Sequence, residues 1–461
     1  MAQSDIFPSS NSSRWGILGA GESGLGAARL AQHVGAQAYV SDSGVVAPKA
    51  LERLQSLGIP YETGHHSLEL LRQCDLIVKS PGIPQSAPVV RALREAGKEV
   101  VSEVEVASRY THATLIGVTG SNGKTTTVSL LHHILRQAGL RATLCGNVGN
   151  SFAEAVVEAP SDFYVIELSS FQLEDLKRFH AHIALILNVT PDHLDRYDNS
   201  MERYADAKFN ITINQTASDY LIYFLSDPYT TKRLARLQNG PQALGFSVAP
   251  CPQARAWQGD AALQFQTSRG SWEIPESHIA LVGRHNMLNV EAAVLAALQL
   301  DVPRQVILDS LSSFKGLEHR LEFVCDVRGV RFINDSKGTN VDAVYYALLS
   351  MDRPVVWVAG GTDKGNDYAP LLPLLREKAK GLVWLGVDND KLNRFFAPLG
   401  LPMAEVRSTD DCVQAAYAMA KPGDVVLLSP ACASFDLFTC YEDRGEQFKR
   451  SALALAKRIE S

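Results

Sequence analysis

The amino-acid sequence predicts an α/β protein of three domains, each built around an open and mostly parallel sheet. Short apolar, β-branched runs recur along the chain and alternate with segments of helical periodicity. Most of these runs end in glycine-bearing or polar turns, as strands of open α/β sheets do where ligands collect. A length of 461 residues exceeds one average domain and fits two or three.

The composition is ordinary for a globular protein. A formal net charge of −6 gives the whole chain no attraction to nucleic acid or acidic membranes. The first fourteen residues lack the apolar core of a secretory signal, and no apolar run is long enough to span a bilayer. The seven cysteines have no paired metal spacing, which favours reduced thiols in a cytoplasm over a disulfide framework.

The first unit begins with a strand that enters a glycine-rich turn. Residues 15–26 (WGILGAGESGLG) contain G-x-G-x-x-G and precede an Ala-rich helix, and a second short strand ends in Asp42. This pattern binds NAD in some proteins, and in others it docks a different diphosphate on a helix N-terminus. A third strand at residues 76–78 leads into the stiff loop 79–84 (KSPGIP), which is either a ligand loop or a simple turn.

Residues 115–127 (LIGVTGSNGKTTT) predict a phosphate-binding loop that opens the second unit, whose start we expect near residue 105. An apolar strand breaks into a glycine turn, then Gly123-Lys124-Thr125 begins a helix. In such a loop backbone N–H groups wrap a polyphosphate, the lysine reaches the terminal phosphates and the threonine hydroxyl ligates Mg²⁺. The strict pattern has glycine where this chain has Val118, so a plain glycine turn is the alternative.

Two later strands of this unit end in polar groups. Residues 162–167 end in Glu167, which indicates a metal ligand beside the phosphate loop, with a solvated strand end as the alternative. Residues 184–189 lead into TPDHLD. Residues 200–213 predict one helix, and on pattern alone Lys208 is a surface lysine whose stem packs along the helix.

Beyond residue 247 the periodicity fades. Residues 262–265 and 271–274 then indicate a β-hairpin across Thr267-Ser268-Arg269-Gly270. A helix that opens near Gly283 carries Asn286 at its start, where the side chain either caps the helix or meets a base.

The third unit starts near Gly316 and repeats the strand-to-polar-loop design. Its crossings lie at residues 332–340, 355–365, 382–386 and 425–436. The lysines and hydroxyls at these strand ends suit anionic substrates. No Ser-His-Asp, Cys-His or zinc-type spacing stands out, so the pattern predicts an ATP- or GTP-using α/β enzyme and goes no further.

Nine motifs, in this order, resemble those of the Mur ligase family: TGSNGKTT, ELSSFQLE, NVTPDHLDRY, YADAK, GRHNMLN, EHRLE, NDSKGTN, GGTDKG and SPACASFD. The resemblance runs from Gly19 to Gly445, and ELSSFQLE, SPACASFD and residues 441–445 resemble the D-glutamate-adding member. It implies an N-terminal Rossmann-like domain for the UDP sugar (1–105). A central P-loop ATPase-like domain (106–316) and a C-terminal Rossmann-like domain for the amino acid (317–461) follow.

The resemblance implies ATP-dependent ligation of D-glutamate to UDP-N-acetylmuramoyl-L-alanine through an acyl phosphate and a tetrahedral intermediate. This reaction makes a peptidoglycan precursor in the cytoplasm and so serves cell-wall biogenesis, cell shape and cell division. The implied cofactors are ATP, two Mg²⁺ ions and a CO₂-derived carbamate on Lys208. The implied partners are small molecules, with neither nucleic acid nor membrane, and the implied state is a monomer.

The resemblance also assigns residues. Catalytic positions fall on Lys124, His193, Lys208 and Asn147, and metal positions on Thr125, Glu167, His193 and Lys208. ATP positions fall on Gly120, Ser121, Asn122, Gly123, Lys124, Thr125, Thr126, Asn286, Arg320 and Asp335. UDP-substrate positions fall on Glu22, Ser23, Asp42, Ser43, Gly82, Asn147 and His193, and D-glutamate positions on Lys337, Thr339, Lys364, Ser434 and Tyr441.

This chain departs from the family at three of these places. Glu22 is an acid where a small or apolar residue is common, and Ser43-Gly44 replaces a Thr-Arg pair seen in some members. Tyr441 stands where some have phenylalanine.

Four alternatives are weaker. A sibling ligase for a diamino acid normally carries an Asp-Asn-Pro-Arg type signature, which this chain lacks. A folylpolyglutamate synthetase lacks the N-terminal unit. An NAD-dependent oxidoreductase leaves the Lys124 loop without a role, and a non-catalytic nucleotide-binding module leaves the lysine-rich third unit unexplained.

Overall fold

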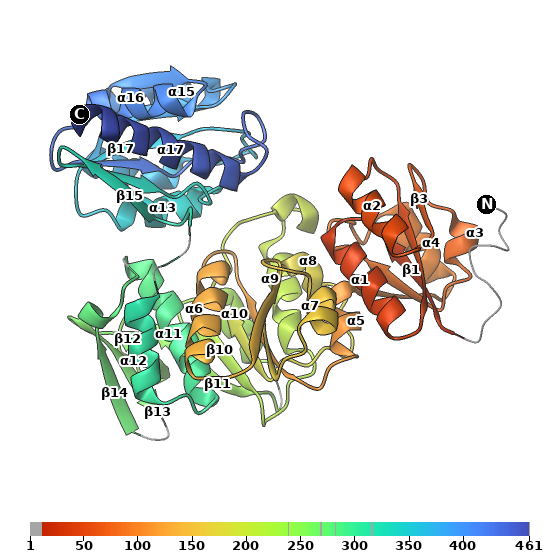
Figure 1. Ribbon diagram of the computed structural model, residues 1–461. Helices are drawn as coiled ribbons and strands as arrows, with labels where there is room; N and C mark the ends of the chain where they lie inside the picture. The colour runs from red at the N-terminus through yellow and green to blue at the C-terminus, as the bar shows by residue number, and fades with distance from the viewer. Residues whose placement is uncertain are drawn as a thin grey trace. The chain divides into compact units, whose positions relative to one another are not determined.

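The computed structural model describes residues 12–237, 239–267, 270–281, 283–314, 316 and 318–460. The chain forms two compact units, one of Met1–Ile279 with Leu288–Ser313 and one of Ala280–Met287 with Phe314–Ser461. The first unit holds two sheets and the second holds one (Figure 1). The expectation for the first fourteen residues falls largely on residues 1–11, outside the described range. Among the described residues, no helix has the length and apolar character needed to cross a membrane.

The first sheet is parallel throughout, with strand order β3-β2-β1-β4-β5. Strands β1, β2, β4 and β5 are short and mostly buried, which explains why most of them form apolar runs in the sequence. The elements are β1 Arg14–Leu18, α1 Glu22–His33, β2 Gln37–Asp42, α2 Pro48–Ser56, β3 Tyr61–Thr63, α3 Leu68–Leu71, β4 Leu76–Lys79, α4 Pro88–Glu95, β5 Glu99–Ser102 and α5 Glu103–Ser108.

Two glycines of the N-terminal fingerprint are required by close packing. A Cβ on Gly24 would lie 1.9 Å from the carbonyl oxygen of Gly19, so only glycine lets α1 sit this close to the turn after β1. A Cβ on Gly26 would lie 2.0 Å from the hydroxyl of Ser151. Ser151 is the residue before helix α7, in the part of the chain that forms the second sheet. These two glycines therefore let α1 pack closely against the turn after β1 and against the start of α7.

Among the residues that the structure describes, the second sheet has nine strands in the order β14-β13-β12-β11-β10-β9-β6-β8-β7. The strands from β7 to β12 pair in parallel, and β12, β13 and β14 pair antiparallel. Its first elements are β6 Thr114–Thr119, α6 Lys124–Gln137, β7 Ala142–Gly146, α7 Phe152–Glu158, β8 Phe163–Glu167, α8 Ser170–Leu173, β9 Ile183–Ile186, η2 Leu194–Tyr197, α9 Met201–Phe209, η3 Asn210–Thr212 and β10 Tyr220–Phe224. Then follow α10 Pro228–Leu234, β11 Gln242–Ser247, β12 Ala254–Gln258, β13 Ala262–Thr267, β14 Gly270–Pro275, η4 Glu276–His278, α11 Arg284–Gln299 and α12 Arg304–Ser313.

Two local predictions can be compared with this sheet. The hairpin is confirmed as β13 and β14, although Ser268 and Arg269 of its turn lie outside the described residues. Strand β12 was not predicted. The single helix predicted over residues 200–213 is confirmed as far as Phe209 and is wrong beyond it, because α9 gives way to a 3₁₀ turn at Asn210. There Asn210 donates its amide to the Leu173 carbonyl, and the Thr212 hydroxyl donates to the Phe209 carbonyl, so side chains compete with helical bonding.

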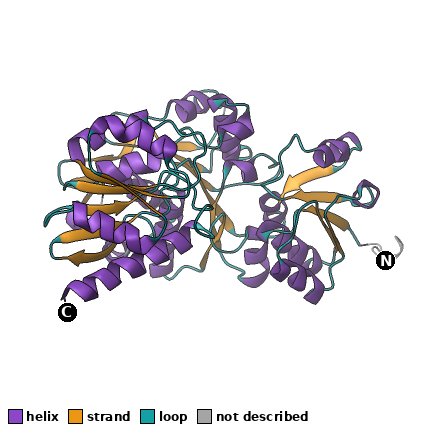
Figure 2. Ribbon diagram, turned by 90° about the horizontal axis from the view of Figure 1, so that it is seen from above, coloured by secondary structure: helices purple, strands orange, loops and turns teal. Residues whose placement is uncertain are grey.

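The third sheet has the order β15-β16-β20-β17-β18-β19, with only the β15–β16 pair antiparallel among its described strands. Helices cover both of its faces (Figure 2). One face buries Trp357 and Trp384, and the other buries Phe332 and Phe448. The elements are β15 Glu322–Val327, β16 Val330–Asn334, α13 Val341–Leu349, β17 Val355–Ala359, η5 Ala369–Leu371, α14 Leu372–Lys378, β18 Ala379–Leu385, α15 Asp390–Phe396, η6 Ala397–Leu399, β19 Met403–Val406, α16 Thr409–Met419, β20 Val425–Leu428 and α17 Tyr441–Glu460.

Candidate active site

The turn between β6 and α6 has the backbone form of a phosphate-binding loop. Gly123 is the residue before α6 and has φ +88°, in the region that favours glycine. A Cβ at this position would also lie 2.3 Å from the side-chain oxygen of Asn289 in α11. The N–H groups of the first turn of α6 remain without helical acceptors, which makes this end of the helix suited to an anion.

The loop is held in place by Asn188, a residue that the sequence did not single out. Its side-chain oxygen accepts the backbone N–H groups of Ser121 (3.1 Å) and Asn122 (2.8 Å), and its amide donates to the Asn122 carbonyl (3.0 Å). The Ser121 hydroxyl donates to the carbonyl of Thr190 (2.8 Å). A polar residue directly after a buried strand was the available signal, but the strand pairing of β9 with β6 is what brings it to the loop.

A cavity of about 190 Å³ adjoins this loop. All four predicted catalytic residues line it, together with Gly82 from the loop after β4. The lining residues are Pro81, Gly82, Lys124, Asn147, Ser169, Ser170, Phe171, Asp192, His193, Tyr204 and Lys208. They come from the carboxyl ends of parallel strands in two sheets of one unit and from α6 and α9, as expected for ligand sites of open α/β sheets. Phe171, Asp192 and Tyr204 were not predicted.

Lys208 is buried, and its interpretation from pattern alone as a surface lysine is wrong. Its ammonium group donates to the Gly120 carbonyl (2.8 Å) and lies 4.5 Å from the ring centre of Tyr204. Burial, reinforced by the nearby charge of Lys124 and opposed by Asp192, holds the pKa of Lys208 well below its usual value. A larger share of its amine is therefore neutral and able to act as a nucleophile.

Glu167 has the environment of a cation ligand. It is buried, and one of its oxygens accepts the side-chain amide of Asn147 (3.0 Å). The other oxygen is buried and has no hydrogen-bond partner among the described residues. A buried carboxylate oxygen without a donor is costly unless a cation binds there, and Thr125, buried in the first turn of α6, offers a hydroxyl of the type Mg²⁺ accepts.

His193 is held in a strained backbone conformation. Its φ is +50°, a left-handed value that few non-glycine residues adopt and that is found often at functional sites. Its ring packs edge-on against the ring of Phe171, with 5.3 Å between ring centres. The His193 side chain lines the cavity.

Within the described residues, the predicted UDP contacts Glu22, Ser23, Asp42 and Ser43 are not among those that line this cavity. Glu22 and Ser23 lie in the first turn of α1. Asp42 accepts backbone N–H groups of Ala20 (2.8 Å) and Gly44 (2.7 Å), so its carboxylate shapes the glycine turn. The structure thus places Gly82, Asn147 and His193 together and leaves these four at the first sheet.

In the second unit, Asp335 follows β16 and is buried. Its oxygens accept the Ser429 hydroxyl (2.7 Å) and the Leu321 N–H (3.3 Å). Burial raises the pKa of Asp335 to about 6, although the positive charges of Arg320 and Arg444 oppose this. Asn286, also in this unit, is buried in the first turn of α11, and its N–H bonds to the Gly283 carbonyl.

Four of the predicted D-glutamate residues lie on loops after strands of the third sheet, and Tyr441 is the first residue of α17. The Lys337 ammonium lies 5.2 Å from the ring centre of Tyr441. The loop that carries exposed Lys364 pairs with the loop that carries buried Ser434 through backbone bonds between Thr362 and Ala433. Thr339 lies in the turn before α13.

Arg444 lies within the motif at residues 441–445 but was not predicted as a site residue. Its side chain holds three of these loops together by hydrogen bonds. It is fully buried in α17 and donates to the Ser336 hydroxyl (2.9 Å) and carbonyl (2.8 Å). It also donates to the carbonyls of Gly360 and Cys432 (both 3.3 Å). Burial lowers the pKa of Arg444 to about 10, so it remains charged at neutral pH.

Three family models match the chain. Residues 13–102 match the Mur ligase MurD-like N-terminal domain, residues 118–297 the Mur ligase middle domain and residues 319–432 the Mur ligase glutamate ligase domain. A protein of Bacteroides thetaiotaomicron called UDP-N-acetylmuramoylalanine–D-glutamate ligase is 48% identical over 94% of this chain and 98% of its own. The chain belongs to the Mur ligase family.

One further relative and two solved structures are also similar to the chain. A protein of Porphyromonas gingivalis with the same name is 47% identical over 95% of this chain and 98% of its own. The solved UDP-N-acetylmuramate-alanine ligase MurC of Thermotoga maritima shares the fold, with a TM-score of 0.61 at 19% identity, covering 96% of this chain and 99% of its own. A pseudomurein peptide ligase type C from Methanothermus fervidus has a TM-score of 0.60 at 17% identity, covering 97% and 100%. The prediction of a three-domain α/β Mur ligase is confirmed.

Proposed function

We propose that this Mur ligase joins D-glutamate to UDP-N-acetylmuramoyl-L-alanine with ATP, giving ADP and phosphate, as a cytoplasmic monomer in peptidoglycan precursor synthesis. The observation that carries the proposal is the cavity that gathers Lys124, Asn147, His193 and Lys208 beside Gly82. The name of the relatives, D-glutamate ligase, supports the choice of amino acid. In this proposal residues 1–105 hold the UDP sugar, 106–316 bind ATP and 317–461 bind D-glutamate.

The chemistry requires activation because a carboxylate is a poor electrophile. An oxygen of the alanyl carboxylate attacks the γ-phosphorus of ATP, and ADP leaves, which gives an acyl phosphate. The amine of D-glutamate then attacks the acyl carbon and loses a proton, and the tetrahedral intermediate expels phosphate. Such catalysis depends chiefly on positioning and on cationic stabilisation of the phosphoryl and tetrahedral charge.

The residues of the cavity divide these tasks. Lys124 donates to the Gly120 (2.8 Å) and Ser121 (2.9 Å) carbonyls, so its charge lies over the loop that would hold the phosphates. Asn147, bonded to Glu167, and His193, fixed by its strained backbone, orient the acyl end of the UDP substrate. Among the nucleotide residues, Gly123 and Thr126 would supply backbone and hydroxyl donors, and Gly120, Ser121 and Asn122 would shape the loop that Asn188 supports. Asn286, Arg320 and Asp335 would bind adenine and ribose.

Two Mg²⁺ ions would supply charge neutralisation of the transferring phosphoryl group. Thr125 and Glu167 would hold one ion, and His193 with a carbamylated Lys208 the other. The lowered pKa of Lys208 favours this modification, in which the neutral amine nitrogen attacks CO₂ and loses a proton, leaving a carboxylate-like ligand.

In the second unit, Lys337, Lys364, Thr339, Ser434 and Tyr441 would surround D-glutamate. Two ammonium groups beside hydroxyl donors form a suitable cradle for a dicarboxylate.

Phosphate release from ATP tests this function. The chain is incubated with UDP-N-acetylmuramoyl-L-alanine, ATP and Mg²⁺, and D-glutamate, L-glutamate, L-lysine, meso-diaminopimelate or no amino acid is added. We expect release with D-glutamate and formation of the UDP-dipeptide by mass spectrometry. Release without an amino acid, or only with another one, would overturn the proposal.

A further inference from the structure

We propose that Arg196 is a positioning residue that couples the UDP-substrate loop, residues 79–84, to the orientation of His193. The inference deepens the proposed function and rests on it. Arg196 lies in the 3₁₀ turn η2 that directly follows His193, and its side chain is only 12% exposed. One guanidinium group therefore contacts both sheets of the first unit beside the cavity.

On one side, Arg196 holds the loop after β4 through its backbone. Its guanidinium donates to the carbonyls of Gly82 (3.3 Å) and Ile83 (3.2 Å). The buried ammonium of Lys79 donates to the same Ile83 carbonyl (2.8 Å). Gly82 lines the catalytic cavity, so the position of its peptide depends directly on the guanidinium.

On the other side, the guanidinium rests on the aromatic support of His193. It lies 4.5 Å from the ring centre of Phe171, and the Phe171 ring packs against the His193 imidazole in an edge-to-face arrangement. A cation over an aromatic face is attracted by the ring electrons, more strongly when desolvated. Movement of the loop is thereby transmitted through Arg196 and Phe171 to the histidine.

Glu174 fixes the orientation of Arg196. Its carboxylate accepts the guanidinium (3.0 Å), the hydroxyl of Tyr197 (2.9 Å) and the amide of Gln85 (3.3 Å). With three donors the carboxylate has little freedom, and the planar guanidinium can direct separate N–H groups to the carbonyls and the carboxylate. Lysine has one nitrogen and cannot reproduce this geometry.

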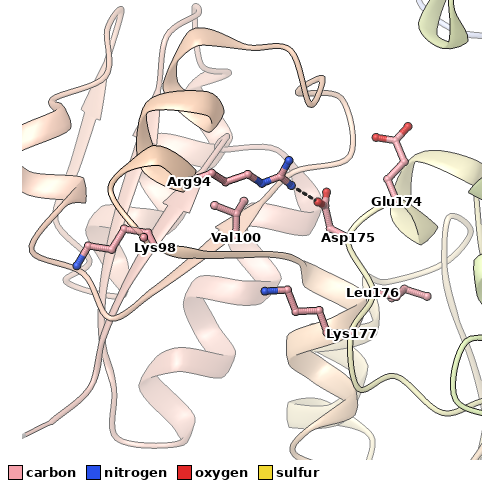
Figure 3. Close-up of a pocket in the computed structure, with 8 residues that line it drawn as sticks. Arg94, Lys98, Val100, Glu174, Asp175, Leu176 and Lys177 are labelled. Carbon is pink, nitrogen blue, oxygen red and sulfur yellow. Dashed lines mark hydrogen bonds and ion pairs between the residues drawn. The ribbon is translucent and has the colours of Figure 1, made fainter.

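Contacts other than those of Arg196 also hold the junction between the two sheets. Asp175 forms ion pairs with Arg94 (2.6 Å) and buried Lys79 (3.1 Å), and Figure 3 shows Arg94 reaching Asp175 across a separate cavity. The Glu105 carboxylate also accepts three consecutive backbone N–H groups, of residues 177–179 (2.9 Å each). Arg196 is distinguished from these contacts by its direct approach to the catalytic cavity.

Steady-state kinetics of Arg196→Gln and Arg196→Lys test the inference. We expect the KM for UDP-N-acetylmuramoyl-L-alanine to rise about 10-fold in both, a loss of about 1.4 kcal/mol, with a lower kcat. The KM values for ATP and D-glutamate should stay within about twofold, because the proposed function assigns this loop to the UDP substrate alone. Arg203→Gln is the matched control, because Arg203 shares a neighbouring cavity with Arg196 but pairs with Asp198 at the surface.

Phe171→Leu completes a double-mutant cycle with Arg196→Gln. If coupling runs through the ring, the two effects on the KM for the UDP substrate should be non-additive. An unchanged KM in Arg196→Gln, full rescue by lysine, or equal rises in all three KM values with a lower melting temperature would overturn the inference. Direct calorimetric binding of the UDP substrate separates this result from failure of the proposed function, which would appear as wild-type chain inactive with D-glutamate.

Discussion

Replacing Asp335 with asparagine should stabilise the C-terminal unit at pH 8 while weakening the use of ATP. The carboxylate is buried after β16, and the donors to it are the Ser429 hydroxyl and the Leu321 N–H. An asparagine in the same rotamer can accept from Leu321 with its oxygen and donate to the Ser429 hydroxyl with its amide. Both polar contacts are then retained without a buried charge.

The magnitude follows from the pKa. Burial raises the pKa of Asp335 from 3.8 to about 6, so the protonated form is favoured in the folded chain. Stability from this group is fully present below the unfolded pKa and is lost as pH rises through about 6. Relative to the fully protonated group, the buried carboxyl therefore lowers the free energy of unfolding by about 3 kcal/mol at pH 8 and by about half as much at pH 5.

Hydrogen exchange of β16 and β20 in the full chain measures this difference. We expect protection in Asp335→Asn to rise by about 100-fold at pH 8 and by clearly less at pH 5. The KM for ATP should rise in the same variant, because the proposed ribose ligand loses its charge. Asp326→Asn, at an exposed position of β15, is the control and should change the opening free energy by less than about 0.5 kcal/mol.

Lower protection of Asp335→Asn at pH 8, or a gain that is the same at both pH values, would refute the reasoning. The first result would mean that the attraction of Arg320 and Arg444 to the carboxylate stabilises the folded chain by more than burial of the charge destabilises it. The second would mean that the carboxyl does not titrate between these pH values in the folded chain.

Three further predictions concern the first unit. Glu103 is buried, one of its oxygens accepts the Ala153 N–H, and its pKa is raised to about 7, so the stabilising protonated form is lost as pH rises. In urea unfolding, the free energy of unfolding of Glu103→Gln should exceed that of the wild type by about 3 kcal/mol at pH 9 and by far less at pH 5. Asn188→Ala removes the side-chain oxygen that accepts the N–H groups of Ser121 and Asn122. The KM for ATP should therefore rise about 10-fold, with little change in the KM for D-glutamate. An unchanged KM for ATP would show that Asn188 does not support the phosphate loop. Lys208→Ala should nearly abolish turnover, with partial rescue by a small carboxylate, and full activity would exclude a carbamate.

The sequence by itself determined the local architecture and the family. Strand β6, its glycine turn and helix α6 follow from periodicity and from the conformational freedom of glycine, which act within about a dozen residues. The predicted hairpin and the open parallel sheets follow from the same local signals. The motifs carried the family assignment, because their spelling and order are specific in a way that composition is not.

Tertiary structure alone decided which polar residues meet. Lys208 reads as a surface residue on its helix, and it is buried only because α9 packs over the loop at Gly120, 88 positions away in the chain. Asn188 reaches Asn122 across 66 positions, and Arg196 reaches Gly82 across 114. Sequence periodicity specifies which face of an element is apolar but not which element covers it, so such partners appear only once the strands are paired into sheets.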